Sequence, residues 1–353
     1  RQMCIRDRYA QYPTFTVFLA VFLGALVTMV LMPFWIRGLK KHLIGQQVRA
    51  DGPESHLVKQ GTPTMGGVVM LVAMAITVFL LAAPELDTTF IMLAIILTGV
   101  LGLIDDASKV AKERSLGLTP KAKLIGQFLI STAFVLAVVN WLGVAPTIDI
   151  PFVATLDFGI LTTTLPFDVP AGQFSIPWLY LIFCDILLMG LSNATNLTDG
   201  LDGLAAGTVM MAILVMAAIA YRLGMLDAAL VGAAIAGCCI GFLWFNAYPA
   251  DIFMGDTGSL ALGMALGCIA IVTKTEVISL IIGGLFVIEA LSVMIQVFYF
   301  KRTKKRLFLM APLHHHFEKR GWSEVKVVVR FWIISACFAA VGFCIFFAQT
   351  MVA

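Results

Sequence analysis

Charged residues are scarce in this chain. Of its 353 residues only 13% are Asp, Glu, Lys or Arg, whereas 60% are hydrophobic. A soluble domain usually carries about 25% charged residues, and several apolar stretches here approach or exceed the roughly 20 residues that cross a bilayer as a helix. The shortage of charge therefore excludes an ordinary soluble protein and predicts an all-α polytopic membrane protein.

The seven cysteines also lack a functional pattern. Six of them lie inside apolar stretches, and their spacing fits neither a metal site nor the disulfide framework of a secreted protein. We therefore expect them to be small core residues that form no disulfide.

The first eight residues differ from everything that follows. Position 1 is not Met, and residues 1–8 carry three arginines, whereas a long apolar run begins at Phe15. We expect residues 1–8 to be a non-native or truncated start. We expect residues 9–353 to form a single transmembrane domain.

Ten apolar segments predict ten transmembrane helices, because in lipid each backbone segment must satisfy its own hydrogen bonds. Some segments are only about 15 residues long, so neighbouring helices or a thin bilayer must shield their ends. The segments are Phe15–Ile36, Gly66–Ala83, Phe90–Ile104, Leu124–Leu142, Pro177–Leu191, Leu204–Tyr221, Ala228–Phe245, Ser259–Val272, Val277–Phe300 and Val327–Ala348.

Positive charge is nearly absent from every second loop. Of the 24 Lys and Arg, five lie between segments 1 and 2, five between segments 3 and 4, and nine around the last loop. The alternate loops hold only Arg222 and Lys274. Because cytoplasmic loops carry the excess of Lys and Arg, both termini are predicted to be periplasmic. The long outside loop, about 143–176, contains β-branched runs and predicts a small periplasmic hairpin.

The loops with the densest polar chemistry all fall on the predicted cytoplasmic side. They are residues 37–65, 105–123, 192–203, 246–258 and 301–326. This one-sided array suits an enzyme with an active-site cleft at the inner membrane surface. A transporter more often places polar groups near the bilayer midplane.

Two carboxylate motifs point to a divalent cation and phosphate. Asp105 and Asp106 end the third segment as adjacent charges that repel unless a cation lies nearby. Mg²⁺ takes one or two carboxylates plus substrate oxygens. Asp256 lies between glycines just before a helix, whose first N–H groups favour phosphate. A solvated helix end and a simple N-cap at Asp256 or Ser259 remain the structural alternatives.

The stretch Asn193–Leu204 is a polar island between two membrane-length apolar runs. It carries two carboxylates, two carboxamides and two glycines. Asp199 and Asp202 are three apart and so share one side of a helical turn, while the glycines allow a ligand to approach closely. We interpret the stretch as one wall of a site for a sugar nucleotide and a metal ion. A helix cap is the alternative.

Other loops offer phosphate and base contacts. Of the three histidines His314–His316 at most two can face one site, and they can bind phosphate or metal or act as acid or base. Phe253 offers an aromatic face for base stacking. Lys59 and Thr64 lie in a Gly- and Pro-rich loop within reach of a diphosphate. An interfacial basic stretch, an interface anchor and a structured loop are the respective alternatives.

Two carboxylates lie well inside apolar segments, Asp185 in the fifth and Glu289 in the ninth. An ionised Asp at a helix centre costs roughly 2.5–3.5 kcal/mol on insertion scales. We therefore expect both to face the bundle interior and to be paired or protonated. Structural pairing and a functional role both stay open.

These motifs together resemble one enzyme family. Asp105–Asp106, Asn193–Leu204, Asn246–Ser259 and Pro312–Glu318 are similar to the polyprenyl-phosphate N-acetylhexosamine-1-phosphate transferases, and the resemblance runs from about residue 15 to the C-terminus. The loop Asp51–Gly67 and the triple His are similar to bacterial members whose donor is UDP-N-acetylmuramoyl-pentapeptide. The family fold has ten helices, a bent ninth helix and a cytoplasmic cleft.

The resemblance implies an activity. Phospho-N-acetylmuramoyl-pentapeptide passes from the UDP-sugar to undecaprenyl phosphate, which gives lipid I and UMP in peptidoglycan synthesis, with Mg²⁺ as cofactor. It also implies a multi-pass catalytic domain in the bacterial cytoplasmic (inner) membrane, among membrane lipids, as a homodimer with no nucleic-acid partner.

The resemblance assigns roles residue by residue. Asp256 is the implied Mg²⁺ ligand, and Asp105, with Asp106 beside it, acts on the lipid phosphate as base or orienting group. His314 and His315 contact the phosphates. The implied uracil subsite comprises Gly200, Leu201, Asp202 and Phe253. The surrounding nucleotide and sugar subsites comprise Lys59, Thr64, Lys121, Asn196, Asp199, Asn246 and Gln296.

Three alternatives stay open. A sister transferase using UDP-N-acetylglucosamine is disfavoured by the pattern at Pro312–Glu318. An intramembrane prenyltransferase would need two Asp-x-x-x-Asp clusters, which the sequence lacks. A transporter is disfavoured by the one-sided polar loops.

Overall fold

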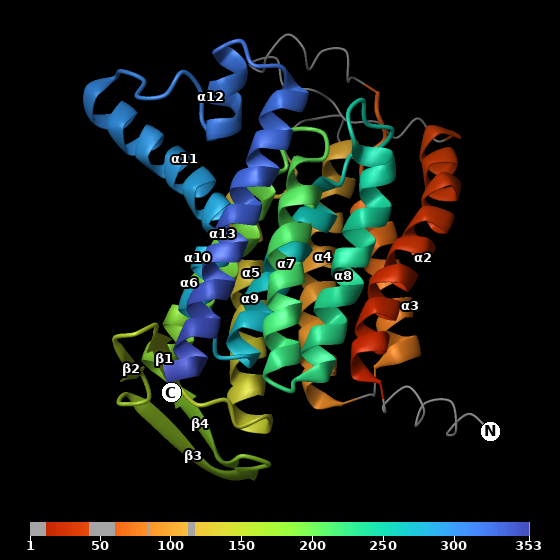
Figure 1. Cartoon of the computed structure of the whole chain (residues 1–353). Helices are drawn as coiled ribbons and strands as arrows, with labels where there is room; N and C mark the ends of the chain where they lie inside the picture. Colours follow the sequence, from red (N-terminus) through yellow and green to blue (C-terminus); the bar gives the residue numbers. More distant parts are fainter. Residues whose placement is uncertain (1–11, 42–60, 83–84, 112–116, 353) are drawn as a thin grey trace, which may run out of the picture.

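The structure, a computed structural model, describes residues 12–41, 61–82, 85–111 and 117–352 (Figure 1). The expectation for residues 1–8 and the assignment of Lys59 lie outside the described residues. The described chain is a bundle of helices with two short β-hairpins at one end (Figure 1).

The helices follow the apolar segments of the sequence. They are α2 (Pro13–Lys41), α3 (Gly67–Leu81), α4 (Leu86–Ala111), α5 (Pro120–Trp141), α6 (Trp178–Thr198), α7 (Leu204–Arg222), α8 (Leu226–Asn246), α9 (Gly255–Val272), α10 (Glu276–Ile282), α11 (Gly284–Thr303), α12 (Leu313–Lys319) and α13 (Glu324–Val352). Within the described ranges nine helices are long and apolar enough to cross a membrane, and α3 is a shorter apolar helix. The chain is therefore a polytopic helical membrane protein.

The ninth apolar segment is two helices rather than one. The α-helical backbone is interrupted at Gly283, between α10 and α11. Beyond this break α11 leans away from the bundle (Figure 1). The bend that the family resemblance implies for Val277–Phe300 is thus a break at a glycine, a residue at which helices commonly kink.

The strands correct two details of the sequence prediction. β1 (Thr147–Ile150) pairs antiparallel with β2 (Ala154–Asp157), and β3 (Thr162–Val169) pairs antiparallel with β4 (Gly172–Pro177). One hairpin was expected and two are present, so the chain is not purely α-helical. The long β-branched stretch turns twice, once between β1 and β2 and once between β3 and β4.

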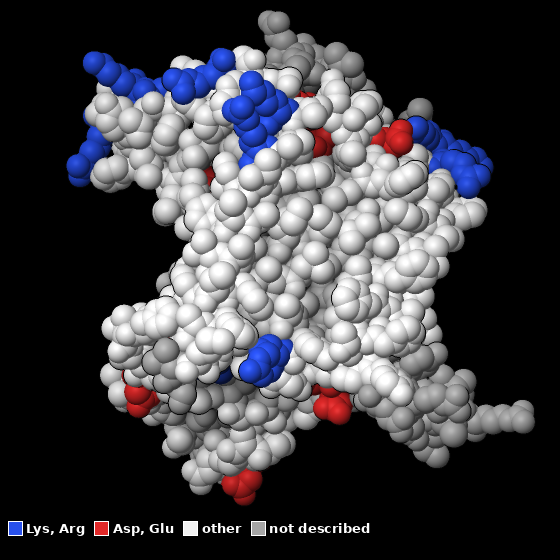
Figure 2. All heavy atoms as spheres, viewed as in Figure 1, with Lys and Arg blue, Asp and Glu red and all other residues white. Residues whose placement is uncertain are grey.

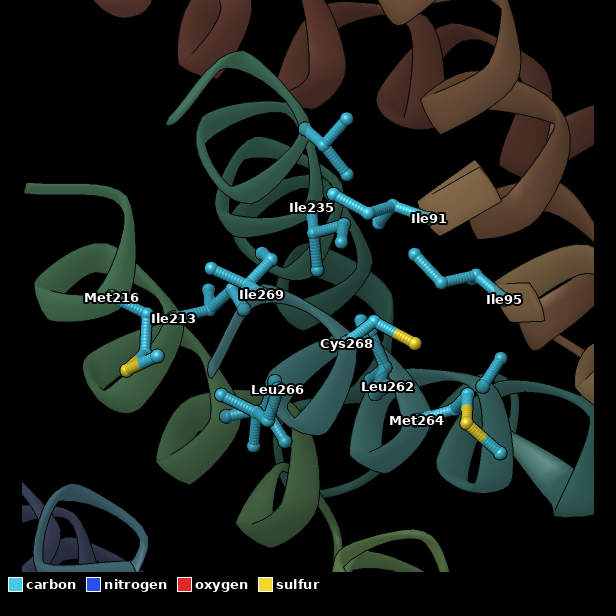
Figure 3. Packing of buried hydrophobic residues seen from close by; sticks show 14 of the residues in the cluster. Ile91, Ile95, Ile213, Met216, Ile235, Leu262, Met264, Leu266, Cys268 and Ile269 are labelled. Carbon is cyan, nitrogen blue, oxygen red and sulfur yellow. The ribbon is translucent and has the colours of Figure 1, made fainter. Parts of the chain in front are cut away.

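α9 lies at the centre of the bundle. It is buried along almost its whole length and packs against α4 and α6. Figure 3 shows its Leu262 and Ile269 among the isoleucines of α4, α7 and α8. α3 comes so close that a Cβ on Gly67 would overlap the α9 backbone at Gly258. This packing fixes the axis of α9, and with it the place of Asp256 in the first turn.

Charge divides the two ends of the bundle. Figure 2 shows Lys and Arg gathered at the end opposite the hairpins, over the tip of α11, the start of α13 and the end of α2. Lys40 and Lys41 close α2, and Lys301 and Arg302 close α11. α2 begins and α13 ends at the hairpin end (Figure 1).

Candidate active site

Three carboxylates converge at the basic end of the bundle. Asp105 and Asp106 lie in the last turns of α4, and Asp256 lies in the first turn of α9. Their oxygens lie within 4.8 Å of one another. We call these three residues the acidic cluster. Two of the three, Asp105 and Asp106, are only 3% exposed, so their charges need partners within the protein.

Asp106 fixes the position of Asp256. Its Oδ1 accepts the backbone N–H of Asp256 at 3.1 Å, and its Oδ2 accepts the N–H and the hydroxyl of Thr257 at 3.0 and 2.8 Å. The N-cap residue of α9, Met254, has no side-chain cap of its own. Asp106 of α4 therefore caps α9 from outside. Gly255 has a φ of +77°, and a Cβ there would overlap Asp106.

Asp105 uses one oxygen to hold the start of α5. Its Oδ1 accepts the N–H of Leu118 at 2.7 Å, just before Thr119, whose side chain caps α5. Its Oδ2 lies 2.6 Å from Nζ of Lys109. The two neighbouring aspartates thus fasten different helices, while one oxygen of Asp105 stays directed toward the cluster.

Two lysines meet the acidic cluster. Nζ of Lys109 lies 3.5 Å from Oδ1 of Asp106 and 3.0 Å from Oδ2 of Asp256, in addition to its contact with Asp105. Nζ of Lys123, in α5, lies 2.8 Å from the same Asp256 oxygen. Two ammonium groups face three carboxylates. The Lys109 ammonium marks a place where a cation is surrounded by carboxylate oxygens, the donors that Mg²⁺ prefers.

The end of α6 completes this side of the site. The Asn196 carboxamide donates to Oδ1 of Asp256 and to the hydroxyl of Ser259, both at 2.8 Å. Asp199, the C-cap of α6, follows one turn later. Burial, and then the negative charges of Asp256, Asp106 and Asp202, raise the pKa of Asp199 to about 8. The negative charge of the acidic cluster therefore acts on a fourth carboxylate, that of Asp199.

The loops after α6 and α8 are tied together. The Asn246 carboxamide accepts the N–H of Gly203 at 3.0 Å and donates to the carbonyl of Ile252 at 2.8 Å. Oδ2 of Asp202 accepts the N–H of Ala250 at 3.0 Å. Both ends of Asn246 are engaged with backbone, so in this structure it positions two loops. Leu201 is buried in an apolar cluster with Leu204, and its carbonyl accepts the N–H of Leu204 at 3.0 Å.

Phe253 and Thr64 reach the same region through a backbone pairing. The N–H of Phe253 donates to the carbonyl of Pro63 at 2.8 Å, and the N–H of Gly66 donates to the carbonyl of Phe253 at 2.9 Å. This pairing places Thr64, which is 7% exposed, beside Gly255. The half-buried Phe253 ring therefore lies on the loop that leads into the acidic cluster.

The three histidines of α12 turn in different directions, as the sequence predicted. His314 is fully buried and packs against Gly200, where a Cβ would overlap its ring. Nδ1 of His315 lies 2.7 Å from Oε2 of Glu318. Nδ1 of His316 accepts the N–H of Leu309 at 3.1 Å, and burial, followed by Arg320, lowers its pKa. His314 thus packs against the loop of Asp199–Asp202, at Gly200.

Two predicted residues lie elsewhere. Lys121 is exposed on the first turn of α5, whereas Lys123 points into the acidic cluster. The Gln296 carboxamide accepts the N–H groups of Leu307 and Phe308 at 3.1 and 2.9 Å, and so fastens the following loop to α11. Lys109 and Lys123 were not assigned from the sequence. Lys109 stands four residues after Asp105 on one helix face, which is a readable signal; Lys123 offers none.

Comparisons with known proteins agree on one family. The family model described as glycosyl transferase family 4 matches residues 88–274, and phospho-N-acetylmuramoyl-pentapeptide-transferase signature 1 matches residues 59–71. A phospho-N-acetylmuramoyl-pentapeptide-transferase of Rubrobacter xylanophilus is 47% identical over 337 residues, which cover 94% of this chain and 98% of the relative. Those of Halalkalibacterium halodurans and Bacillus subtilis are 45% and 44% identical, covering 91% and 92% of this chain and 94% and 96% of the relatives.

Proposed function

Since the chain belongs to the family of phospho-N-acetylmuramoyl-pentapeptide-transferases, we propose that the acidic cluster is its catalytic centre. The chain transfers phospho-N-acetylmuramoyl-pentapeptide from its UDP-sugar to undecaprenyl phosphate, which gives lipid I and UMP in peptidoglycan synthesis. The resemblance found in the sequence is thereby confirmed. One observation carries the proposal: three carboxylates and two lysines from α4, α5 and α9 meet at one point.

We propose Mg²⁺ as the cofactor of this centre. The donor set fits, because the carboxylate oxygens converge and already surround the Lys109 ammonium. Asp256 is the proposed ligand, with Oδ2 of Asp105 beside it. Asp106 instead positions Asp256, since its oxygens accept the first N–H groups of α9. Mg²⁺ bound there offsets the charge of the diphosphate.

The protein's own task is to hold two anions in line and to offset their charge. An oxygen of the lipid phosphate attacks the β-phosphorus of the donor, and the bond from that phosphorus to UMP breaks. A phosphate monoester, with its second pKa near 6, is already mostly dianionic at pH 7. Asp105 is therefore proposed to orient the acceptor rather than to act as a required base. Lys109 and Lys123 supply positive charge beside the transferred group.

The donor's nucleotide is proposed to lie along the loops after α6 and α8. The backbone of Gly200 and Leu201, together with Asp202, faces uracil, and the ring of Phe253 stacks on it. Further contacts to the phosphates and the sugar are proposed for Thr64, Asn196, Asp199, His314 and His315. The remaining assignments, which depend on the resemblance, are Lys59, Lys121, Asn246 and Gln296.

We propose a placement in the bacterial inner membrane. Residues 9–353 form one catalytic domain that crosses ten times, with α3 as a short crossing and α10 and α11 sharing one. The site then faces the cytoplasm and both termini the periplasm. This is supported by the Lys and Arg at the site end (Figure 2) and by the shared end of α2 and α13 (Figure 1). The homodimer follows from the family resemblance.

The test is transfer from labelled UDP-N-acetylmuramoyl-pentapeptide to undecaprenyl phosphate by the purified full chain, with and without Mg²⁺. A parallel reaction uses labelled UDP-N-acetylglucosamine. We expect labelled lipid only with the muramoyl donor and only with Mg²⁺. Preference for UDP-N-acetylglucosamine would favour the sister transferase, and turnover unaffected by chelation would contradict the cofactor.

A further inference from the structure

Glu289 is a carboxylate buried on a helix that is otherwise largely exposed. The buried residues of α11 are Gly284, Leu285, Phe286, Glu289 and Ser292, and Glu289 is 0% exposed. Residues on the opposite side, such as Met294 and Phe298, are exposed. A carboxylate in such a place is costly unless hydrogen bonds compensate its burial. Its partners therefore indicate why it stands there.

Those partners lie on α12, the helix that carries the histidines. Oε2 of Glu289 accepts the N–H of Leu313 at 2.9 Å, and Oε1 accepts the N–H of His314 at 3.2 Å. One side chain thus holds two consecutive backbone N–H groups. Since hydrogen bonds to a charged acceptor are roughly twice as strong as neutral ones, Glu289 fixes where α12 begins relative to α11.

The imidazole of His314 lies between Glu289 and the loop after α6. Nδ1 is 3.3 Å from Oε2 of Glu289, close enough for an ion pair when the ring is protonated, although not aligned as a hydrogen bond. Among the described residues neither ring nitrogen has a hydrogen-bond partner. Nε2 lies against Gly200, where a Cβ would overlap it. The ring therefore bridges a buried carboxylate and the loop after α6.

The His315 ring lies beside this pair, with its centroid 4.2 Å from that of His314, and an apolar cluster lies next to α12. Leu201, Leu285 and Phe331 form a buried cluster against which Leu313 of α12 packs. In the part of the chain that the structure describes, His314 is the one basic side chain within 4 Å of Glu289. The Ser292 hydroxyl donates to the backbone carbonyl of Glu289 and not to its carboxylate. The carboxylate thus acts on α12 and on His314.

We propose that Glu289 is a positioning residue, which holds the His314 imidazole over Gly200 so that Nε2 is directed at the loop after α6, along which the donor is proposed to lie. The proposal rests on the proposed function of the site. His315 provides the contrast, since its Nδ1 is held by Glu318 on its own helix. Glu289 acts on the reaction through His314 and touches no substrate itself.

A double-mutant cycle tests this in the purified full chain. Glu289→Gln keeps the size of the side chain and one acceptor oxygen. Its NH₂ group replaces the other oxygen, so it cannot accept the second backbone N–H or form an ion pair with His314. We expect kcat to fall about 10- to 100-fold, the usual loss when a group that orients a functional side chain is removed. In a His314→Ala background the same change should cost less than about twofold, because the residue it positions is gone. In a His315→Ala background most of the loss should remain, because His314 is still present.

Asp185→Asn is the matched control, since Asp185 is a buried carboxylate of α6 that accepts from Thr132 at 2.9 Å, away from α12. It should show no coupling to His314→Ala. Losses from Glu289→Gln that multiply with His314→Ala would overturn the proposal and leave a general packing role.

A second readout does not need turnover. In ¹⁵N-histidine NMR spectra, assigned by His314→Ala and His315→Ala, Glu289→Gln should shift the His314 ring signals by more than those of His315, whose ring centroid lies 4.2 Å away. Unchanged His314 signals would overturn the proposal even in a fully active enzyme. If the His314 signals shift but the chain transfers no phosphosugar, the positioning role of Glu289 would stand and the proposed function of the site would be refuted.

Discussion

The bundle holds two lysine–carboxylate clusters, one near each end. At the basic end, Lys109 and Lys123 face Asp105, Asp106 and Asp256. Toward the hairpin end, Nζ of Lys274 lies 2.9 Å from Oε1 of Glu276 and donates to the carbonyls of Ala145 and Thr147. The hydroxyl of Tyr180 donates to the same Glu276 oxygen at 2.8 Å. We call Lys274, Glu276 and Tyr180 the Lys274 cluster.

The difference lies in charge balance rather than residue type. The Lys274 cluster has one cation for one anion, and backbone carbonyls take the remaining ammonium protons, so it ties β1 to the turn before α10. The acidic cluster has fewer lysines than carboxylates, and its oxygens converge on one point. Only the second arrangement gains from an added divalent cation and a phosphate. The predictions below test this distinction, in order of decreasing effect.

Asp256→Asn should lower transfer by about 10²- to 10³-fold or more, as expected when a group that stabilises transition-state charge is lost. The chain should stay folded, because Asp106 still caps α9 through backbone N–H groups. Steady-state transfer and the unfolding midpoint in detergent measure both. Glu276→Gln, at the other end, should keep kcat/KM, and near-normal turnover of Asp256→Asn would refute the metal assignment.

Lys274→Met should lower the free energy of unfolding by about 3–5 kcal/mol, because it leaves the buried Glu276 charge without its cation. Transfer per folded molecule should not change. The double variant Lys274→Met/Glu276→Gln should recover most of the loss. Denaturant titration of the wild type, the single variant and the double variant measures these differences. A double variant as unstable as the single one would show that the ion pair is not the cause.

Phe253→Ala should raise the donor KM by about 10-fold, since stacking of a base on an aromatic ring is worth about 1–3 kcal/mol. The value of kcat should fall less, because Phe253 is proposed to contact the base rather than the transferred phosphate. Initial rates over a donor concentration series separate the two constants. An unchanged KM would refute stacking.

Asp199 should give the metal-free protein a pH-dependent stability. Its pKa of about 8 lies above the ordinary 3.8, so the folded chain keeps a proton that the unfolded chain has lost. Between about pH 4 and 8 the folded state therefore binds more protons, and stability falls as pH rises. Relative to Asp199→Asn, the wild-type Tm without Mg²⁺ should drop from pH 5 to pH 8 and then level off. Parallel Tm curves would contradict the shift.

The sequence predicted the helices well, because apolar length in a membrane leaves the backbone few choices. The family resemblance implied a bend in the ninth segment, but apolar length alone did not place the break at Gly283, since helix direction depends on what α10 and α11 pack against. Of the site, Asp105 and Asp106 were readable as a cation motif, whereas Asp256 was readable as a helix start that favours phosphate and was assigned to the metal by the family resemblance. The sequence did not show that Asp105 holds the start of α5 while Asp106 caps α9, because this difference depends on where α9 begins.

The sequence also did not show which lysine reaches the acidic cluster. Lys121 and Lys123 are two residues apart at the start of α5, and only the rotation of that helix against α4 decides which one reaches Asp256. Asn246 is similar: its type suggested a ligand contact, yet both ends of its carboxamide bind backbone. Glu289 was readable as a carboxylate that needs a partner, but not as the partner of α12.

The most direct test counts Mn²⁺, which takes the same oxygen ligands as Mg²⁺, on the full chain in the presence of the donor. Electron paramagnetic resonance titration would compare the wild type with Asp256→Asn and Glu276→Gln. We predict a single Mn²⁺ site in the wild type and in Glu276→Gln, with at least about tenfold weaker binding in Asp256→Asn. Equal Mn²⁺ affinity in all three proteins would contradict the assignment of the acidic cluster as the catalytic metal centre.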